Sequence, residues 1–238
     1  MQLFYNASLS QTSGSILFDK DESRHIFKVL RYKSGDALYV TNGQGLLVKA
    51  ILNVVDPKKT VAEIISSENV APLPYRLHLA VAPTKLNDRY EWFLEKATEI
   101  GVSEITPIIC DHSERKVIKA DRYERILQSA MKQSLKAWLP ILNPAITLRE
   151  FLETDRNEEI KCIAHCENSE KSSLKDVVVP QEPVTVLIGP EGDFSLNEIE
   201  RAMEQGYTGI HLGSSRLRTE TAALVACHSV AFINQISS

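Results

Sequence analysis

The sequence predicts a protein of two parts, a β-rich N-terminal region and an α/β region with a parallel sheet. Three observations predict this fold class. Short alternating apolar segments fill about the first 70 of 238 residues. Two prolines within Ala71-Pro72-Leu73-Pro74 favour an extended linker. After the linker, strand-like apolar runs alternate with helical patterns. We therefore expect one domain over residues 1–71 and a second over residues 72–238.

In the N-terminal region, the alternation predicts strands at residues 2–5, 15–18, 37–41, 46–55 and 60–65. Asn42-Gly43 favours a hairpin between the two central strands. Residues 21–31 are expected to form a short helix, because apolar residues recur on one side of it. Together these elements predict a small β-barrel that carries one helix.

In the C-terminal region, apolar runs predict strands at residues 76–82, 105–110, 160–164, 184–188 and 209–212. Asn87 and Asp121 are expected to cap two long helices. Ser195, with Glu198 three residues later, is a capping-box signature for a third. A final helix is expected at residues 220–235. Such alternation indicates a parallel sheet covered by helices on both faces.

The functional site is expected within residues 184–223. The strand at 184–188 breaks at Gly189-Pro190-Glu191-Gly192, and the strand at 209–212 stops at Gly213-Ser214-Ser215. In open parallel sheets, ligands bind just beyond such strand ends. Glycine at these turns lets a ligand approach the backbone closely.

Several site classes do not fit these turns. No Walker loop or Gly-x-Gly-x-x-Gly motif is present. Glu191 and Asp193 would repel phosphate and suit a neutral or cationic ligand. Ser195 is better explained as a helix cap than as a nucleophile, because the Gly-x-Ser-x-Gly elbow is missing. His165 is followed by Cys166, which suggests a metal or thiol site, but a strand-end histidine beside a buried cysteine explains the pair better.

Composition narrows the possible partners. The net charge of −4 argues against a non-specific nucleic-acid binder, although basic residues cluster at 24–33 and 115–125. No apolar run approaches the roughly 20 residues of a membrane helix, and the N-terminus lacks a secretion signal. The four cysteines show no zinc-ligand spacing. We therefore expect a cytoplasmic protein with reduced thiols, no membrane segment and no metal.

Two C-terminal motifs are similar to those of a known family. Leu187 to Ser195 with Glu198, and Leu212 to Ala223, resemble the C-terminal signature of the RsmE family. Members of this family methylate N3 of a uridine in 16S (small-subunit) ribosomal RNA and belong to the SPOUT superfamily. Shorter supporting motifs are His25 with Val29-Leu30-Arg31, Glu95 to Val102, Ser113-Glu114-Arg115 and Gln133-Ser134.

The resemblance implies a PUA-like β-barrel followed by a SPOUT α/β domain with a trefoil knot. It implies S-adenosylmethionine as cofactor, bound by Leu187, Ile188, Gly189, Glu191, Gly192, Leu212, Gly213, Leu217, Arg218, Thr219 and Ala222. In such a site, Arg218 would stabilise charge that develops on the uracil, and Glu220 would take the N3 proton or orient Arg218. For Glu220, a simple stabilising role at a helix N-terminus remains open.

The resemblance also implies a homodimer and contacts with RNA phosphates. The RNA-binding candidates are Arg24, His25, Lys28, Arg31, Arg115 and Lys132. Two departures from the family pattern concern RNA contacts: Asn6 follows aromatics where an Arg is common, and Leu135-Lys136 replaces a Gly-Arg pair. Two other functions stay open: a catalytically inactive RNA-binding protein, and a SPOUT ribose 2′-O-methyltransferase.

Overall fold

The computed structural model describes residues 2–154 and 160–235, which fold into two compact units. The first comprises Met1–Pro72 and Met131–Leu139, and the second comprises Leu73–Ala130 and Pro140–Ser238. The sequence did not indicate that Met131–Leu139 would return to the first unit. This segment is fixed there through Ala137, whose carbonyl accepts hydrogen bonds from Thr41 Oγ1 and from the backbone N–H of Gly45, both at 3.0 Å.

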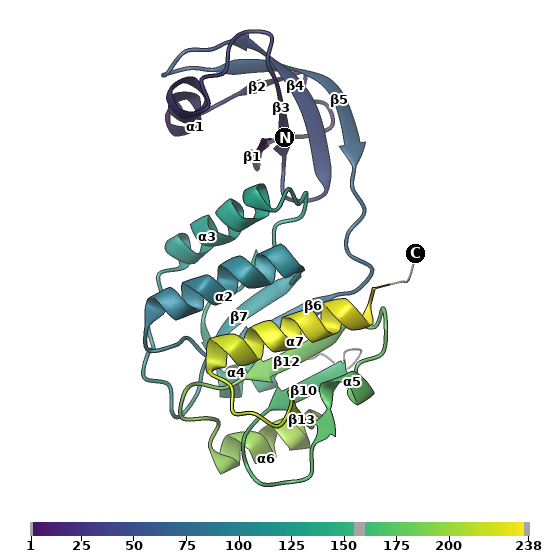
Figure 1. Ribbon diagram of the computed structural model, residues 1–238. Coiled ribbons are helices and arrows are strands. Elements are labelled where there is room, and N and C mark those ends of the chain that lie inside the picture. The colour runs from purple at the N-terminus through teal and green to yellow at the C-terminus, as the bar shows by residue number, and fades with distance from the viewer. Residues whose placement is uncertain (1, 155–159, 236–238) are drawn as a thin grey trace. The chain divides into compact units, whose positions relative to one another are not determined.

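The first unit contains one five-stranded sheet in the order β1-β3-β4-β5-β2. Its strands are β1 (Leu3–Tyr5), β2 (Ser15–Leu17), β3 (Ala37–Thr41), β4 (Leu46–Val54) and β5 (Val61–Asn69). Within the described residues no pairing joins β1 to β2, so the sheet is a curled, open half-barrel (Figure 1). The small β-barrel that we expected is therefore formed only as a half-barrel. Its two edge strands have three residues each and offer few hydrogen bonds for closure.

The expected hairpin is present, because β3 and β4 pair antiparallel. The Oδ1 atom of Asn42 accepts hydrogen bonds from the backbone N–H groups of Gln44 at 2.8 Å and Leu46 at 3.2 Å. Gly43 and Gly45 have φ angles of 72° and 92°, which only glycine adopts without strain. The Asn-Gly pattern therefore predicted the turn of this hairpin correctly.

The helix expected at residues 21–31 is shorter and irregular. It consists of α1 (Lys20–Arg24) and a π-helical turn, η1 (His25–Val29). Asp19 caps α1 by accepting hydrogen bonds from two backbone N–H groups of the first turn. In the wider turn, the N–H of Leu30 reaches back five residues to the carbonyl of His25 at 3.0 Å.

The second unit contains an eight-stranded sheet in which every pairing is parallel. The order is β11-β13-β10-β12-β6-β7-β8, and β9 also pairs with β7. The strands are β6 (Leu77–Val81), β7 (Glu104–Ile109), β8 (Ile141–Leu142), β9 (Ile146–Thr147), β10 (Ile160–Ala164), β11 (Ser172–Ser173), β12 (Val184–Ile188) and β13 (Thr208–His211). The longer strands confirm the predicted parallel sheet. The two-residue strands were missed, because two residues carry no periodicity.

The helices of the chain beyond residue 86 are α2 (Asn87–Ile100), α3 (Ala120–Gln133), α4 (Leu148–Leu152), α5 (Leu174–Val177), α6 (Leu196–Glu204) and α7 (Thr219–Ile233). Figure 1 shows α2 and α7 side by side over one face of the second unit's sheet. Helices α4 and α6 pack with Ile163 and Leu187 in one apolar cluster. None of the helices in the described residues is both long and apolar enough to span a membrane.

The capping predictions had mixed outcomes. The capping box of Ser195 and Glu198 is confirmed at the start of α6. Asn87 is not a cap: Leu86 occupies that position in α2, and the side chain of Asn87 instead accepts a 2.8 Å hydrogen bond from the hydroxyl of Tyr123. Asp121 lies inside the first turn of α3, which begins one residue earlier.

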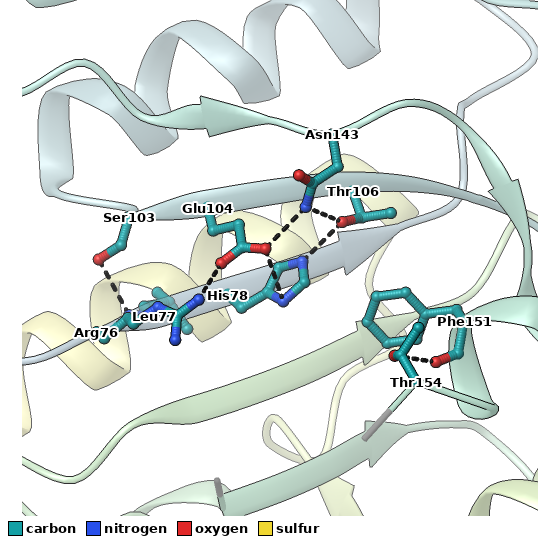
Figure 2. A network of polar contacts seen from close by, with 9 residues as sticks. All are labelled: Arg76, Leu77, His78, Ser103, Glu104, Thr106, Asn143, Phe151 and Thr154. Atoms are coloured by element: carbon teal, nitrogen blue, oxygen red, sulfur yellow. Dashed lines mark hydrogen bonds and ion pairs between the residues drawn. The ribbon is translucent and has the colours of Figure 1, made fainter. Parts of the chain in front are cut away.

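A buried polar network lies near the amino ends of β6 and β7 (Figure 2). Glu104 accepts hydrogen bonds from Arg76 at 2.5 Å and from Asn143 at 2.8 Å, and its Oε1 lies 3.6 Å from His78 Nδ1. The other ring nitrogen of His78 lies 2.7 Å from Thr106 Oγ1. Burial by itself would raise the pKa of Glu104, but the electrostatic effect of His78, the two hydrogen bonds and the charge of Arg76 outweigh it and lower that pKa.

Candidate functional site

Three neighbouring strands of the second unit end side by side. The register pairs Ile188 of β12 with Ala164 of β10, and Ala164 with Ile210 of β13. Because the strands are parallel, the chain leaves all three at the same edge of the sheet, which we call the carboxyl edge. Ligands of open parallel sheets bind at such an edge. The stretch singled out in the sequence therefore occupies a position where a ligand site is expected.

The loop after β12, residues 189–195, is held firmly by its neighbours. Asp193 Oδ2 accepts a 2.7 Å hydrogen bond from the N–H of Cys166, in the loop after β10. Glu198, at the start of α6, accepts a 2.9 Å hydrogen bond from the N–H of Asp111, in the loop after β7. The first bond fixes the loop to the end of β10, and the second fixes the start of α6, directly after the loop, to the end of β7.

The glycines of this loop make room for protein side chains. A Cβ atom on Gly189 would lie 3.1 Å from the ring of Phe194, and one on Gly192 would lie 3.1 Å from the Cβ of His112. Both distances are shorter than ordinary contacts, so larger residues would displace these neighbours. The sequence suggested that these glycines leave room for a ligand. At Gly189 and Gly192, glycine is also required because protein side chains lie against the backbone.

Gly213, in the loop after β13, is different. Its φ is 120°, and a Cβ atom placed on it would meet no heavy atom within 4 Å. Open space thus borders the backbone of this loop, residues 212–218. At the end of the loop, Thr219 Oγ1 donates a 3.0 Å hydrogen bond to the carbonyl of Gly189. The two motifs, some thirty residues apart in sequence, are therefore joined directly.

Unsatisfied polar atoms gather at the same edge. Among the described residues, three buried side-chain atoms have no hydrogen-bond partner: both ring nitrogens of His165 and Oε2 of Glu220. His165 directly follows β10, and Glu220 lies in the first turn of α7. The other carboxylate oxygen of Glu220 is 3.9 Å from Nε of Arg89, in α2. Buried polar groups are normally paired, so the three unpaired atoms at this edge can form hydrogen bonds with a ligand.

The cofactor candidates all lie at this edge. Leu187 and Ile188 end β12; Gly189, Glu191 and Gly192 follow it; Leu212, Gly213, Leu217 and Arg218 belong to the second loop; and Thr219 and Ala222 begin α7. Leu187 and Ile188 are buried, whereas Leu212 and Leu217 are partly exposed. The accessible apolar side chains are thus those of the second loop. Glu191 accepts a 2.9 Å hydrogen bond from the N–H of Lys85 and so ties its loop to the end of β6.

The two catalytic candidates have contrasting surroundings. Arg218 is exposed at the N-cap of α7, and in the described residues its side chain makes no hydrogen bond or ion pair. Glu220 is buried, with 7% of its surface exposed. In the described residues no hydrogen bond or ion pair joins the two side chains, and Glu220 instead pairs with Arg89. Arg218 is therefore free to meet a ligand, whereas Glu220 is held in place.

The RNA-binding candidates are distributed over both units. Arg24, His25, Lys28 and Arg31 lie on or just after α1 and η1, and all but His25 are well exposed. Lys132 pairs with Glu22 of α1 at 2.9 Å within the same unit. Arg115 belongs to the second unit and donates hydrogen bonds to the carbonyls of Thr84 at 3.0 Å and Lys85 at 2.8 Å. Its guanidinium group therefore stabilises a loop of the carboxyl edge.

Sequence reasoning missed several residues at this edge. Arg89, His112 and Lys85 all contact the two motifs from other strand ends, and His165 was set aside. A usable signal existed, because each of these residues follows a predicted strand of a parallel sheet, at or near the start of the next loop or helix. The rule that placed the site beyond β12 and β13 applies equally to β6, β7 and β10.

Comparison with protein families agrees with this arrangement. A family model described as an RNA methyltransferase domain matches residues 71–231. A second, described as an RNA methyltransferase PUA domain, matches residues 18–65. The first match includes every strand of the parallel sheet and both loops described above. The second covers most of the half-barrel, so the N-terminal unit is PUA-like.

Individual relatives are similar over nearly the whole chain. The ribosomal RNA small subunit methyltransferase E of Buchnera aphidicola (subsp. Acyrthosiphon pisum) is 30% identical over 88% of this chain and 85% of its own. A crystal structure of a probable rRNA-methyltransferase from Porphyromonas gingivalis has 39% identity and a TM-score of 0.92, with 98% of each chain covered. The Neisseria gonorrhoeae small subunit methyltransferase E, solved with S-adenosyl methionine, has 28% identity, a TM-score of 0.87 and the same coverage. The chain therefore belongs to the ribosomal RNA small subunit methyltransferase E family.

Proposed function

We propose that this protein transfers a methyl group from S-adenosylmethionine to N3 of a uridine in small-subunit ribosomal RNA. Family membership supports the reaction class. The single observation in the structure that supports it most is the hydrogen bond from Thr219 to Gly189. It joins the two loops that carry the family's motifs and leaves open space beside Gly213.

The residues present are a good fit for the cofactor. The open side of Gly213 can admit a ligand against the backbone, and Leu212 and Leu217 offer partly exposed apolar surface for an adenine ring. The acidic side chains Glu191 and Glu220 suit a cationic sulfonium. The relative from Neisseria gonorrhoeae is bound to the same compound. The remaining cofactor candidates named above would complete the site.

The chain's main contribution is orientation. S-adenosylmethionine, when bound, supplies a methyl group that its sulfonium already activates. Holding a nucleophile in line with such a group contributes about 7–11 kcal/mol to lowering a barrier. The hydrogen bonds that fix residues 189–195 to neighbouring strand ends provide this rigidity, because they hold the loop in one conformation.

Two side chains can manage the charge and the proton. Uracil N3 carries a proton that must leave as the new N–CH3 bond forms, and negative charge spreads onto the flanking carbonyl oxygens. Arg218, exposed and without a protein partner in the described residues, stabilises that charge. Glu220 accepts the proton, since it lies two residues from Arg218 at the start of α7 and its buried Oε2 has no partner in the described residues.

The PUA-like unit supplies RNA contacts. Arg24, Lys28 and Arg31 expose three cations within eight residues of one short helical segment. Such side chains bind phosphates, position the substrate and make binding sensitive to salt. Lys132, beside α1, adds a fourth cation to this surface. His25 is partly buried and contributes as a hydrogen-bond donor.

We also propose a trefoil knot, a homodimer and a cytoplasmic location. The segment after β13 must pass β10 to bring Thr219 beside the end of β12, and such a crossing supports a knotted connection. Helix α7 is apolar around most of its circumference and exposes 65% of Phe232, which supports a partner helix. Ribosomal RNA as substrate supports the cytoplasm.

The test is in two steps. Calorimetric titration of S-adenosylmethionine into the purified protein should give saturable binding. Incubation with small-subunit RNA or the assembled subunit should then yield 3-methyluridine, identified by mass spectrometry of the digested nucleosides. A methyl group on the ribose 2′-oxygen would replace the N3 assignment. Absence of cofactor binding, with and without RNA, would leave an RNA-binding protein without this activity.

A further inference from the structure

His165 occupies the centre of the carboxyl edge, although neither motif contains it. It follows β10 directly, and β10 lies between β12 and β13 in the sheet. Its preceding residue, Ala164, is in register with both Ile188 and Ile210. His165 therefore stands between the starts of the two loops that carry the proposed cofactor site.

The imidazole of His165 is buried but unpaired. Only 6% of the residue is exposed, and neither ring nitrogen has a hydrogen-bond partner in the described part of the chain. A buried polar group left in this way destabilises the fold, so an unmatched imidazole indicates a partner that joins it when a ligand binds. Glycine at position 209 makes room for the ring, because a Cβ there would lie 3.0 Å from Nε2 of His165.

The protonation state of the ring limits the possible partners. Burial lowers the pKa of His165, and the positive charge of Lys171 lowers it further, which outweighs the opposite effects of Asp193 and Glu167. At neutral pH the ring is thus uncharged and has one N–H donor and one acceptor nitrogen. A carboxylate would favour the protonated ring, and an ammonium group could use only the acceptor.

We propose that His165 binds the nucleoside part of the cofactor, with a ring nitrogen hydrogen-bonded to a ribose hydroxyl. A hydroxyl both donates and accepts, so it can pair with either nitrogen of a neutral imidazole. The backbone next to His165 is already fixed to the cofactor loop through the 2.7 Å bond from Cys166 N–H to Asp193. The proposal rests on the proposed function and adds a residue outside both family motifs.

His165→Phe tests this directly, because phenylalanine keeps the ring and its burial but has no nitrogen. Calorimetry with S-adenosylhomocysteine should show an affinity about 5- to 150-fold weaker than for the wild type, the ratio that a lost hydrogen-bond partner of about 1–3 kcal/mol produces. Without ligand, the variant should melt at the same or a higher temperature, because unpaired buried nitrogens are gone. His228→Ala, an exposed histidine of α7, is the control and should bind normally.

Two further measurements make the result specific. With 5′-methylthioadenosine, which keeps the nucleoside and lacks the amino acid, His165→Phe should lose the same factor in affinity. In the wild type, the ring signals of His165 in NMR spectra should shift saturably as S-adenosylhomocysteine is added, which also covers a variant that fails to fold.

Equal affinity of His165→Phe and wild type would overturn the proposal, as would ring signals that do not move. A loss confined to S-adenosylhomocysteine would place the contact on the amino acid part and overturn the nucleoside assignment. If the wild type binds neither S-adenosylmethionine nor S-adenosylhomocysteine, the proposed function itself fails. The two failures can be told apart: a wild type that does not bind overturns the proposed function, whereas a wild type and a variant that bind equally well overturn only the role of His165.

Discussion

The hydroxyl of Thr219 donates a 3.0 Å hydrogen bond to the carbonyl of Gly189. Thr219 is the first residue of α7, and Gly189 is the first residue after β12. The bond closes the carboxyl edge between two loops that are otherwise attached to different strands. It also satisfies a buried carbonyl, which would need another partner if the hydroxyl were absent.

Thr219→Val should therefore loosen the cofactor site. Valine has nearly the same shape but leaves the Gly189 carbonyl unpaired, which costs about 1–3 kcal/mol of unfolding free energy. Urea denaturation without ligand measures this loss, and calorimetry should show weaker cofactor binding as well. Thr219→Ser keeps the hydroxyl and should lose much less. A valine variant as stable as the wild type would show that the bond contributes nothing.

Gly213→Val should abolish cofactor binding while the protein stays folded. The new side chain enters the open space beside the loop, and its φ of 120° adds strain of about 1–3 kcal/mol. Gly35→Val is a matched control, since Gly35 has a φ of 95°, equally open surroundings and a place in the first unit. Both variants should lose similar thermal stability, but only the first should lose cofactor affinity. Equal affinity in both would exclude Gly213 from the site.

Arg218→Ala should reduce turnover far more than cofactor affinity. Loss of one donor to charge that develops in a transition state typically costs 10²- to 10³-fold in rate. Single-turnover methylation of RNA measures the rate, and calorimetry measures the affinity. Arg216→Ala removes another exposed arginine of the same loop and serves as control. If the two variants methylate equally fast, Arg218 has no role in the chemistry.

Local patterns predicted local structure well. The Asn42-Gly43 hairpin and the Ser195 capping box depend on residues close in sequence, and both form as expected. Asn87 carries an equally good capping signal, but its side chain bonds to Tyr123, 36 residues away. A tertiary contact thus replaced a local one.

The candidate site could be predicted only in part, for the same reason. The two glycine turns are visible in the sequence because each follows a strand. The pairing of Arg89 with Glu220 joins residues from α2 and α7, and nothing in either segment indicates the other. His165 does follow a predicted strand, but its burial without a partner, which distinguishes it, has no local signal. Such features depend on the order of strands in the sheet, which periodicity does not determine.

Replacing Arg24 and Arg31 together by alanine should weaken RNA binding and its dependence on salt. Each lost phosphate contact lowers the slope of log K against log salt by about 0.7–0.9, so the slope should fall by about 1.4–1.8. Binding of a uridine-containing small-subunit RNA at several salt concentrations measures this slope. The paired control replaces Lys58 and Lys59, two exposed lysines in a turn of the same unit. A slope unchanged in the arginine variant would place the RNA elsewhere.

Glu104→Gln should make the fold less sensitive to acid. In the wild type, the pKa of Glu104 is lower in the folded protein than in the unfolded chain, so its carboxylate stabilises the fold at neutral pH. Ordinary carboxyl groups protonate near pH 4, so the contribution begins to fall there. It is fully lost once the pH has also passed below the lower pKa of the folded protein. Glutamine cannot ionise, and because it removes the charge that Glu104 presents to Arg76 and His78 (Figure 2), it should cost about 1–3 kcal/mol at pH 7. Urea denaturation should show a constant difference between pH 7 and about pH 5, and a difference that shrinks as the pH falls from there to pH 3. Glu150→Gln is an informative control, because the pKa of this exposed carboxyl is also lowered, through hydrogen bonds from Thr147, yet it lies outside the network. A difference for Glu104→Gln that stays constant over this range would show that its charge does not contribute to stability.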